Sequence, residues 1–93
     1  MRKDEEKEIR ELYETVLKLK TVKDCEMLFE DMCTKNEISA MAQRIRAAKL
    51  LKEGNTYGQV IAATEISSAT LSRVSKCLKY GAGYQKFVGE EEK

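Results

Sequence analysis

The segment from Ser67 to Lys76 combines hydroxyl-bearing and cationic side chains in a pattern suited to DNA recognition. Serine, threonine and arginine side chains can hydrogen-bond to base edges in the major groove and to backbone phosphates. The segment contains no aspartate or glutamate, so its surface is polar and basic. The residues predicted to contact DNA are Ser67, Ser68, Ala69, Thr70, Ser72, Arg73 and Lys76.

Two short helices joined by a tight turn are predicted to position this segment, over about residues 56–78. Thr56 and Gln59 have the spacing of a capping box, which marks the start of the first helix. The second helix is predicted to begin near Ser67 or Ser68, and Ile66 is expected to point inward from the turn. Three apolar residues at spacings of three and four form its expected buried stripe, namely Leu71, Val74 and Leu78.

This arrangement predicts a DNA-binding helix-turn-helix, and the structural alternative is a plain helical hairpin within a helical core. One residue departs from the usual pattern. The turn often contains glycine where the backbone needs a positive φ, and Glu65 occupies that place here. Either Glu65 adopts a strained backbone conformation or the turn has another shape.

Length and composition favour one small all-α domain over residues 1–89. The 93 residues include no proline and only five glycines. No apolar run approaches the length of a membrane span, so no membrane association is expected. The N-terminus is too charged and too acidic for a secretory signal, which predicts a cytoplasmic protein.

Side chains that could perform catalysis or bind a metal are scarce. The chain has no histidine, which argues against most zinc sites and most acid–base catalysis near neutral pH. Cys25, Cys33 and Cys77 lie at or beside apolar helical positions, so buried thiols are expected. No phosphate-binding glycine loop or nucleophile with an adjacent base is present. We therefore expect neither an enzyme nor a bound metal or cofactor.

The net charge of +1 conceals an uneven distribution. Residues 1–39 carry 8 Lys and Arg against 11 Asp and Glu, a net charge of −3. Residues 40–88 carry 8 against 2, a net charge of +6, and they include the predicted helix-turn-helix. Attraction to phosphate is the simplest use of such a block, although an ordinary solvated basic face has the same composition. Residues 90–93 are predicted to form a disordered acidic tail.

Three further helices are predicted before the helix-turn-helix, over residues 4–20, 22–33 and from Thr34 to about Glu53. The first has a single apolar stripe opposite a charged face, and such a helix needs another surface to cover it. The inner side of the third is predicted to consist of Ile38, Met41, Ala42, Ile45, Ala48 and Leu51. Its other side is predicted to be basic, with Arg44, Arg46, Lys49 and Lys52.

Several short motifs resemble those of one family of regulators. They are Gln43-Arg44-Ile45-Arg46, Leu50-Leu51, Ala69-Thr70-Leu71-Ser72-Arg73 and Leu78-Lys79-Tyr80-Gly81-Ala82-Gly83-Tyr84. Together they make the chain similar to the Trp repressor superfamily, and most similar to its YerC/YecD-type branch, from about Leu12 to Tyr84. The resemblance implies a Trp-repressor-like helical bundle that forms an intertwined homodimer. It also implies that two helix-turn-helix units bind double-stranded DNA at a near-palindromic operator.

The resemblance also identifies a candidate effector pocket. In the Trp repressor the corepressor lies between the third helix and the recognition helix. Thr34 and Arg44 match positions that hold the polar end of that ligand, and Arg73 matches the arginine against its indole. Val74 replaces a glycine that leaves room for the ring, and Cys77 replaces a serine that bonds the ligand. The resemblance therefore implies that the basic side of the pocket remains while its open space does not.

Two functions remain open on the sequence alone. The first is a sequence-specific DNA-binding regulator of the repressor type that does not respond to tryptophan, with a small-molecule effector of another shape left open. The second is a helical dimerisation module that binds another protein through the face from Arg44 to Lys52, without binding DNA. Salt-dependent binding to duplex DNA distinguishes them.

Overall fold

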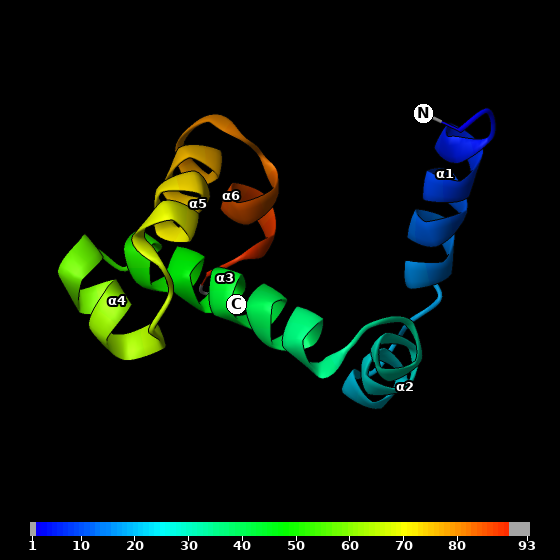
Figure 1. Cartoon of the computed structure of the whole chain (residues 1–93), viewed down its shortest axis with the longest axis horizontal. Coiled ribbons are helices and arrows are strands. Elements are labelled where there is room, and N and C mark those ends of the chain that lie inside the picture. Colours follow the sequence, from blue (N-terminus) through cyan, green and yellow to red (C-terminus); the bar gives the residue numbers. More distant parts are fainter. Residues whose placement is uncertain (1, 90–93) are drawn as a thin grey trace. The chain divides into compact units, whose positions relative to one another are not determined.

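The computed structural model describes residues 2–89, and helices are the only regular elements in this range (Figure 1). The predicted all-α class is confirmed. The predicted acidic tail, residues 90–93, lies outside the described residues. The helices are α1 (Glu5–Val16), α2 (Val22–Met32), α3 (Lys35–Lys52), α4 (Tyr57–Thr64), α5 (Ser68–Tyr80) and α6 (Gly83–Phe87).

The helices belong to two compact units, one ending at Lys35 and the other beginning at Asn36. The first unit contains α1 and α2, and neither of these helices has a buried residue. The apolar stripe of α1 remains exposed, from 40% at Ile9 and Leu12 to 63% at Tyr13. A helix gains most of its stability by packing its apolar face, so this stripe requires a covering surface.

The boundary between α1 and α2 differs from the prediction, because α1 ends at Val16 and not near residue 20. The amides of Lys18 and Leu19 donate to carbonyls three residues back, which tightens the chain into a turn. The side chain of Thr21 then caps α2 by accepting from the Asp24 amide at 3.0 Å. The Asp24 carboxylate accepts from the amide of Lys20, one residue before the predicted capping-box partner.

The second unit has a small apolar core formed by α3, α4 and α5. Its largest fully buried side chains are Val60, Ile66, Leu71 and Val74. Ala47 and Ala48 contribute the small side chains of α3 to the same core. Burial of Ile66, Leu71 and Val74 confirms the predicted inward positions, whereas Leu78 is half-buried.

The predicted inner face of α3 is only partly correct, since Ala48 is buried and Leu51 packs against the core as predicted, but other members are not in the core. Ala47 and Ala48 face the core, while Ile45 is 52% exposed and Ala42 is also exposed. The physical reason is that α3 carries two apolar faces. A stripe at spacings of three and four is centred on a different side of the helix from Ala47, and Ala48, three residues after Ile45, lies at its border with the core. We call it the outer stripe of α3, and it consists of Ile38, Met41, Ala42 and Ile45.

Two polar side chains connect α6 to the rest of its unit. The Lys52 ammonium donates to the backbone carbonyl of Gln85 at 2.9 Å and also to that of Val88. The side-chain amide of Gln85 donates to the carbonyl of Leu78 at 3.0 Å. Lys52 therefore binds the C-terminal end of α6. This structural role comes in addition to the predicted position of Lys52 on a basic surface.

The cysteines differ from their predicted burial. All three are free thiols, and Cys25 is exposed while Cys33 and Cys77 are half-buried. Cys25 lies on α2, which has no buried residue within residues 2–89. Between residues 2 and 89, no helix has the length and apolar character needed to cross a bilayer. The same range holds no cluster of three or more side chains arranged to bind a metal ion.

Candidate nucleic-acid interface

The start of α4 is fixed by the predicted capping box. The Gln59 amide donates to the hydroxyl of Thr56 at 3.2 Å, and the Thr56 amide donates to the side-chain oxygen of Gln59 at 2.8 Å. These two bonds satisfy amides that have no partner within the helix. The first helix of the helix-turn-helix therefore has a defined starting point one residue after Thr56.

The turn between α4 and α5 is held by bonds from both sides. The Glu65 amide donates to the carbonyl of Ile61 at 2.8 Å, closing the last turn of α4. The side-chain amide of Gln43, on α3, donates to the carbonyl of Thr64 at 2.8 Å. The Thr64 hydroxyl in turn accepts from the amide of Ile66 at 3.2 Å. The turn between α4 and α5 is thus bonded to α3, the longest helix of the unit.

Glu65 adopts the left-handed conformation, with φ of 61° and ψ of 19°. The first of the two alternatives therefore holds: the turn keeps the conformation that glycine usually supplies, and a glutamate adopts it. For a residue with a Cβ atom this conformation costs about 1–2 kcal/mol. Hydrogen bonds around Thr64 and the burial of Ile66 stabilise the turn against that cost.

Replacing Glu65 with glycine is expected to leave the free energy of unfolding unchanged or to raise it by up to about 1 kcal/mol. The free energy gained by relieving the backbone strain equals or exceeds the entropic cost of ordering glycine, which is more flexible in the unfolded chain. Thermal unfolding followed by circular dichroism measures the effect. Glu65→Ala is the matched control, because it removes the carboxylate and keeps the Cβ. A glycine variant less stable than the alanine variant would contradict the strain.

The first turn of α5 is capped by Ser67. Its hydroxyl accepts from the amide of Thr70 at 3.1 Å and donates to the Thr70 hydroxyl at 2.9 Å. Thr70 is half-buried, and its hydroxyl accepts the proton that Ser67 donates. Of the predicted DNA contacts, Ser67 therefore defines where α5 begins.

One face of α5 carries the remaining predicted DNA contacts. Ala69, Ser72, Arg73 and Lys76 are exposed and have the spacing of a single helical face. Ser68 is exposed in the first turn of the same helix. The opposite face, with Leu71 and Val74, is buried in the core. The structure thus brings the predicted residues together on one surface of α5.

Lys79 extends the exposed face by one turn and is absent from the predicted set. It is exposed and stands three residues after Lys76. It is also the basic residue in the last turn of α5, where a cation is favoured by the helix dipole. Its spacing of three residues from Lys76 was the signal in the sequence that could have placed Lys79 on this face. The anchoring contact of Gln43 gave no such signal, because it depends on how α3 and α4 pack.

The predicted effector pocket is only partly assembled within one unit. Thr34 belongs to the first unit, whereas Arg44, Arg73, Val74 and Cys77 belong to the second. Arg44 and Cys77 are half-buried, and Arg73 is exposed. Val74 is 1% exposed and is part of the apolar core. Its side chain therefore lies in the interior of the second unit.

Comparisons with known proteins agree with this arrangement. A model of the Trp repressor protein family matches residues 7–92. The uncharacterized protein YerC of Bacillus subtilis (strain 168) is 47% identical over 75 residues, which cover 81% of this chain and 72% of YerC.

Two solved structures have the same fold. A candidate Trp repressor from Staphylococcus aureus has a TM-score of 0.82 and 34% identity, covering 91% of this chain and 89% of its own. A TrpR-like protein from Eubacterium eligens ATCC 27750 has a TM-score of 0.82 and 40% identity, covering 86% and 84%. Since the family model spans most of the sequence and the folds agree, this chain belongs to the Trp repressor family.

Proposed function

We propose that the protein is a sequence-specific DNA-binding transcriptional regulator of the repressor type. The observation that carries this proposal is the exposed face of α5, where cationic and hydroxyl side chains gather without a carboxylate. This face lies on a helix whose start is capped and whose other side is buried. Membership of the Trp repressor family supports the same function.

The proposed regulator acts as a homodimer. The exposed apolar stripe of α1 and the absence of buried residues in α2 support this state, because a second copy can cover these surfaces. A two-fold symmetric dimer presents two α5 helices, which enter successive major grooves about one helical turn apart. The proposed target is therefore a near-palindromic operator in double-stranded DNA.

The test is a selection of bound duplexes from a random DNA pool, followed by titration of the selected operator at several salt concentrations. Phosphate contacts by the basic face predict a linear fall of log K with log salt concentration. Sedimentation at micromolar concentration is expected to give about twice the 10.6 kDa chain mass. A folded monomer, or a protein that enriches no sequence, would contradict the proposal and favour the protein-binding alternative.

Tryptophan is expected neither to bind measurably nor to change operator affinity. Val74 is buried in the core, so an indole beside it would have to displace packed atoms. Overpacking of this kind costs about 1–3 kcal/mol, and about 1.4 kcal/mol lowers an affinity tenfold. Calorimetry with tryptophan, then DNA titration with and without it, checks the expectation. Saturable binding that raises operator affinity would show that the space beside Val74 is open.

A further inference from the structure

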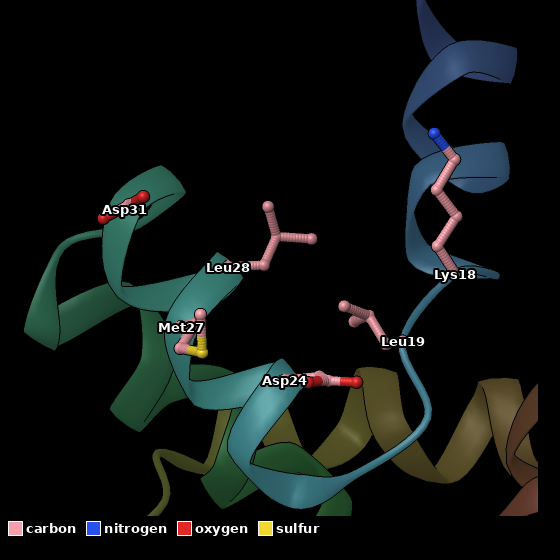
Figure 2. A pocket seen from close by; sticks show the side chains of 6 residues that line it. All are labelled: Lys18, Leu19, Asp24, Met27, Leu28 and Asp31. Carbon is pink, nitrogen blue, oxygen red and sulfur yellow. The ribbon is translucent and has the colours of Figure 1, made fainter.

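A shallow pocket on the first unit lies between the end of α1, the link to α2 and one side of α2. Its volume is about 320 Å³, and it is lined by Lys18, Leu19, Asp24, Met27, Leu28 and Asp31. Figure 2 shows Leu19 and Leu28 pointing into the space between the link and α2. The two aspartates stand seven residues apart on α2, which separates them by roughly 10 Å along the helix. The pocket thus has an apolar floor between two acidic positions.

This floor is not covered within its own unit. Met27 is 59% exposed, and α2 contributes no buried residue. The hollow is open and shallow, so a small molecule in it would remain largely in water. An extended protein surface with an apolar side chain and a neighbouring cation matches its shape and charge better.

The outer stripe of α3 has these properties. Ile45 is 52% exposed, and the exposed Arg46 follows it directly. Within residues 2–89 neither Arg46 nor Asp31 takes part in an ion pair. Asp24 is less available, because its carboxylate already accepts from the Lys20 amide. The two units also have net charges of opposite sign, −2 for residues 1–35 (8 Lys and Arg against 10 Asp and Glu) and +3 for residues 36–93 (9 against 6).

We propose that Ile45 of a second copy of this chain fills the pocket, and that Arg46 of that copy pairs with Asp31 at its edge. This inference rests on the proposed homodimer and specifies which surfaces form it. In a two-fold symmetric dimer each copy supplies one pocket and one outer stripe, so the contact occurs twice. The apolar side chain supplies the buried area, and the arginine–carboxylate pair determines which surfaces meet.

Charge reversal tests the pairing by sedimentation equilibrium over a concentration series. Asp31→Lys and Arg46→Glu each place like charges together at both contacts. Each variant alone is expected to raise the dimer dissociation constant about tenfold or more. The double variant carries both reversals and is expected to return to near the wild-type constant, because lysine then faces glutamate at both contacts.

Mixing the two single variants distinguishes contact between copies from contact within one chain. In a mixed dimer one contact pairs lysine with glutamate, and the other keeps the natural aspartate and arginine. We therefore expect the mixture to form heterodimers at concentrations where each variant alone dissociates. Recovery in the mixture also shows that both variants fold well enough to assemble.

Glu30→Lys is the matched control, since Glu30 is an exposed carboxylate beside Asp31 that does not line the pocket. It is expected to change the dissociation constant less than twofold. Rescue by the double variant without rescue by mixing would place the contact within one chain and overturn the proposal. Single variants that dimerise like wild type would overturn it as well, while leaving the homodimer and its DNA binding intact. A wild-type protein that is monomeric would instead refute the proposed function.

Discussion

Replacing Leu71 with alanine is expected to lower the free energy of unfolding by about 2–5 kcal/mol. Leu71 is fully buried between the helices of the second unit, with Val60, Ile66 and Val74 as its buried companions. Truncation removes the transfer free energy of the lost carbons and leaves a cavity that a core this small fills incompletely. The loss is a large share of the roughly 5–15 kcal/mol that stabilises a typical domain.

Urea denaturation at fixed protein concentration measures the change, because the stability of the proposed dimer would depend on concentration. Ser72→Ala is the control on the same helix, since Ser72 is exposed and its replacement is expected to alter stability by less than about 0.5 kcal/mol. A Leu71→Ala variant that loses less than about 1 kcal/mol would contradict the buried position of this side chain.

The second large effect is expected in DNA binding. Arg73→Ala should weaken binding to a selected operator by about 1–3 kcal/mol if its guanidinium bonds to a guanine. The side chain is exposed on α5, and the core does not include it. The thermal stability of the free protein should therefore remain within about 0.5 kcal/mol of wild type. Titration of the operator and of a scrambled duplex measures the specific part of the loss.

Lys76→Ala provides the comparison for Arg73→Ala. Lys76 is exposed on the same face, and a lysine that meets phosphate contributes equally on every sequence. Its loss should weaken operator and scrambled duplex alike and reduce the salt slope by about one. If both variants weakened the two duplexes equally, Arg73 would have a phosphate contact and no role in base recognition.

The helix-turn-helix was predictable because its signals are local. Thr56 with Gln59, and the spacing of Leu71 and Val74, mark caps and a buried stripe within a few residues of the chain. The same local reasoning predicted that Glu65 stands at a position of positive φ, but it could not decide whether the backbone adopts that conformation. The turn is also held by Gln43, whose side chain bonds to the carbonyl of Thr64 from a distant part of the chain, and no local pattern predicts that contact.

The two faces of α3 were harder to predict. Its apolar residues spread around more than one side of the helix. Periodicity alone cannot separate these sides, so the sequence predicts one broad inner face. Packing divides them, because Ala47 and Ala48 are small enough for close approach in the core while Ile45 remains outside. The role of Lys52 at the end of α6 likewise depends on tertiary packing, since its partners lie more than 30 residues away. The DNA contacts and the effector pocket remain predictions.

The burial of Val74 suggests how ligand control could be gained or lost during evolution. Valine and glycine codons differ by a single nucleotide, and the three carbon atoms of this side chain separate a filled interior from one with a hole. An apolar hole in a core lowers stability and can be occupied by a small aromatic molecule. A Val74→Gly protein would therefore fold best with a guest in place. The proposed regulator would thus lie one point mutation from a ligand-dependent variant, which makes position 74 a starting point for engineering a molecular switch.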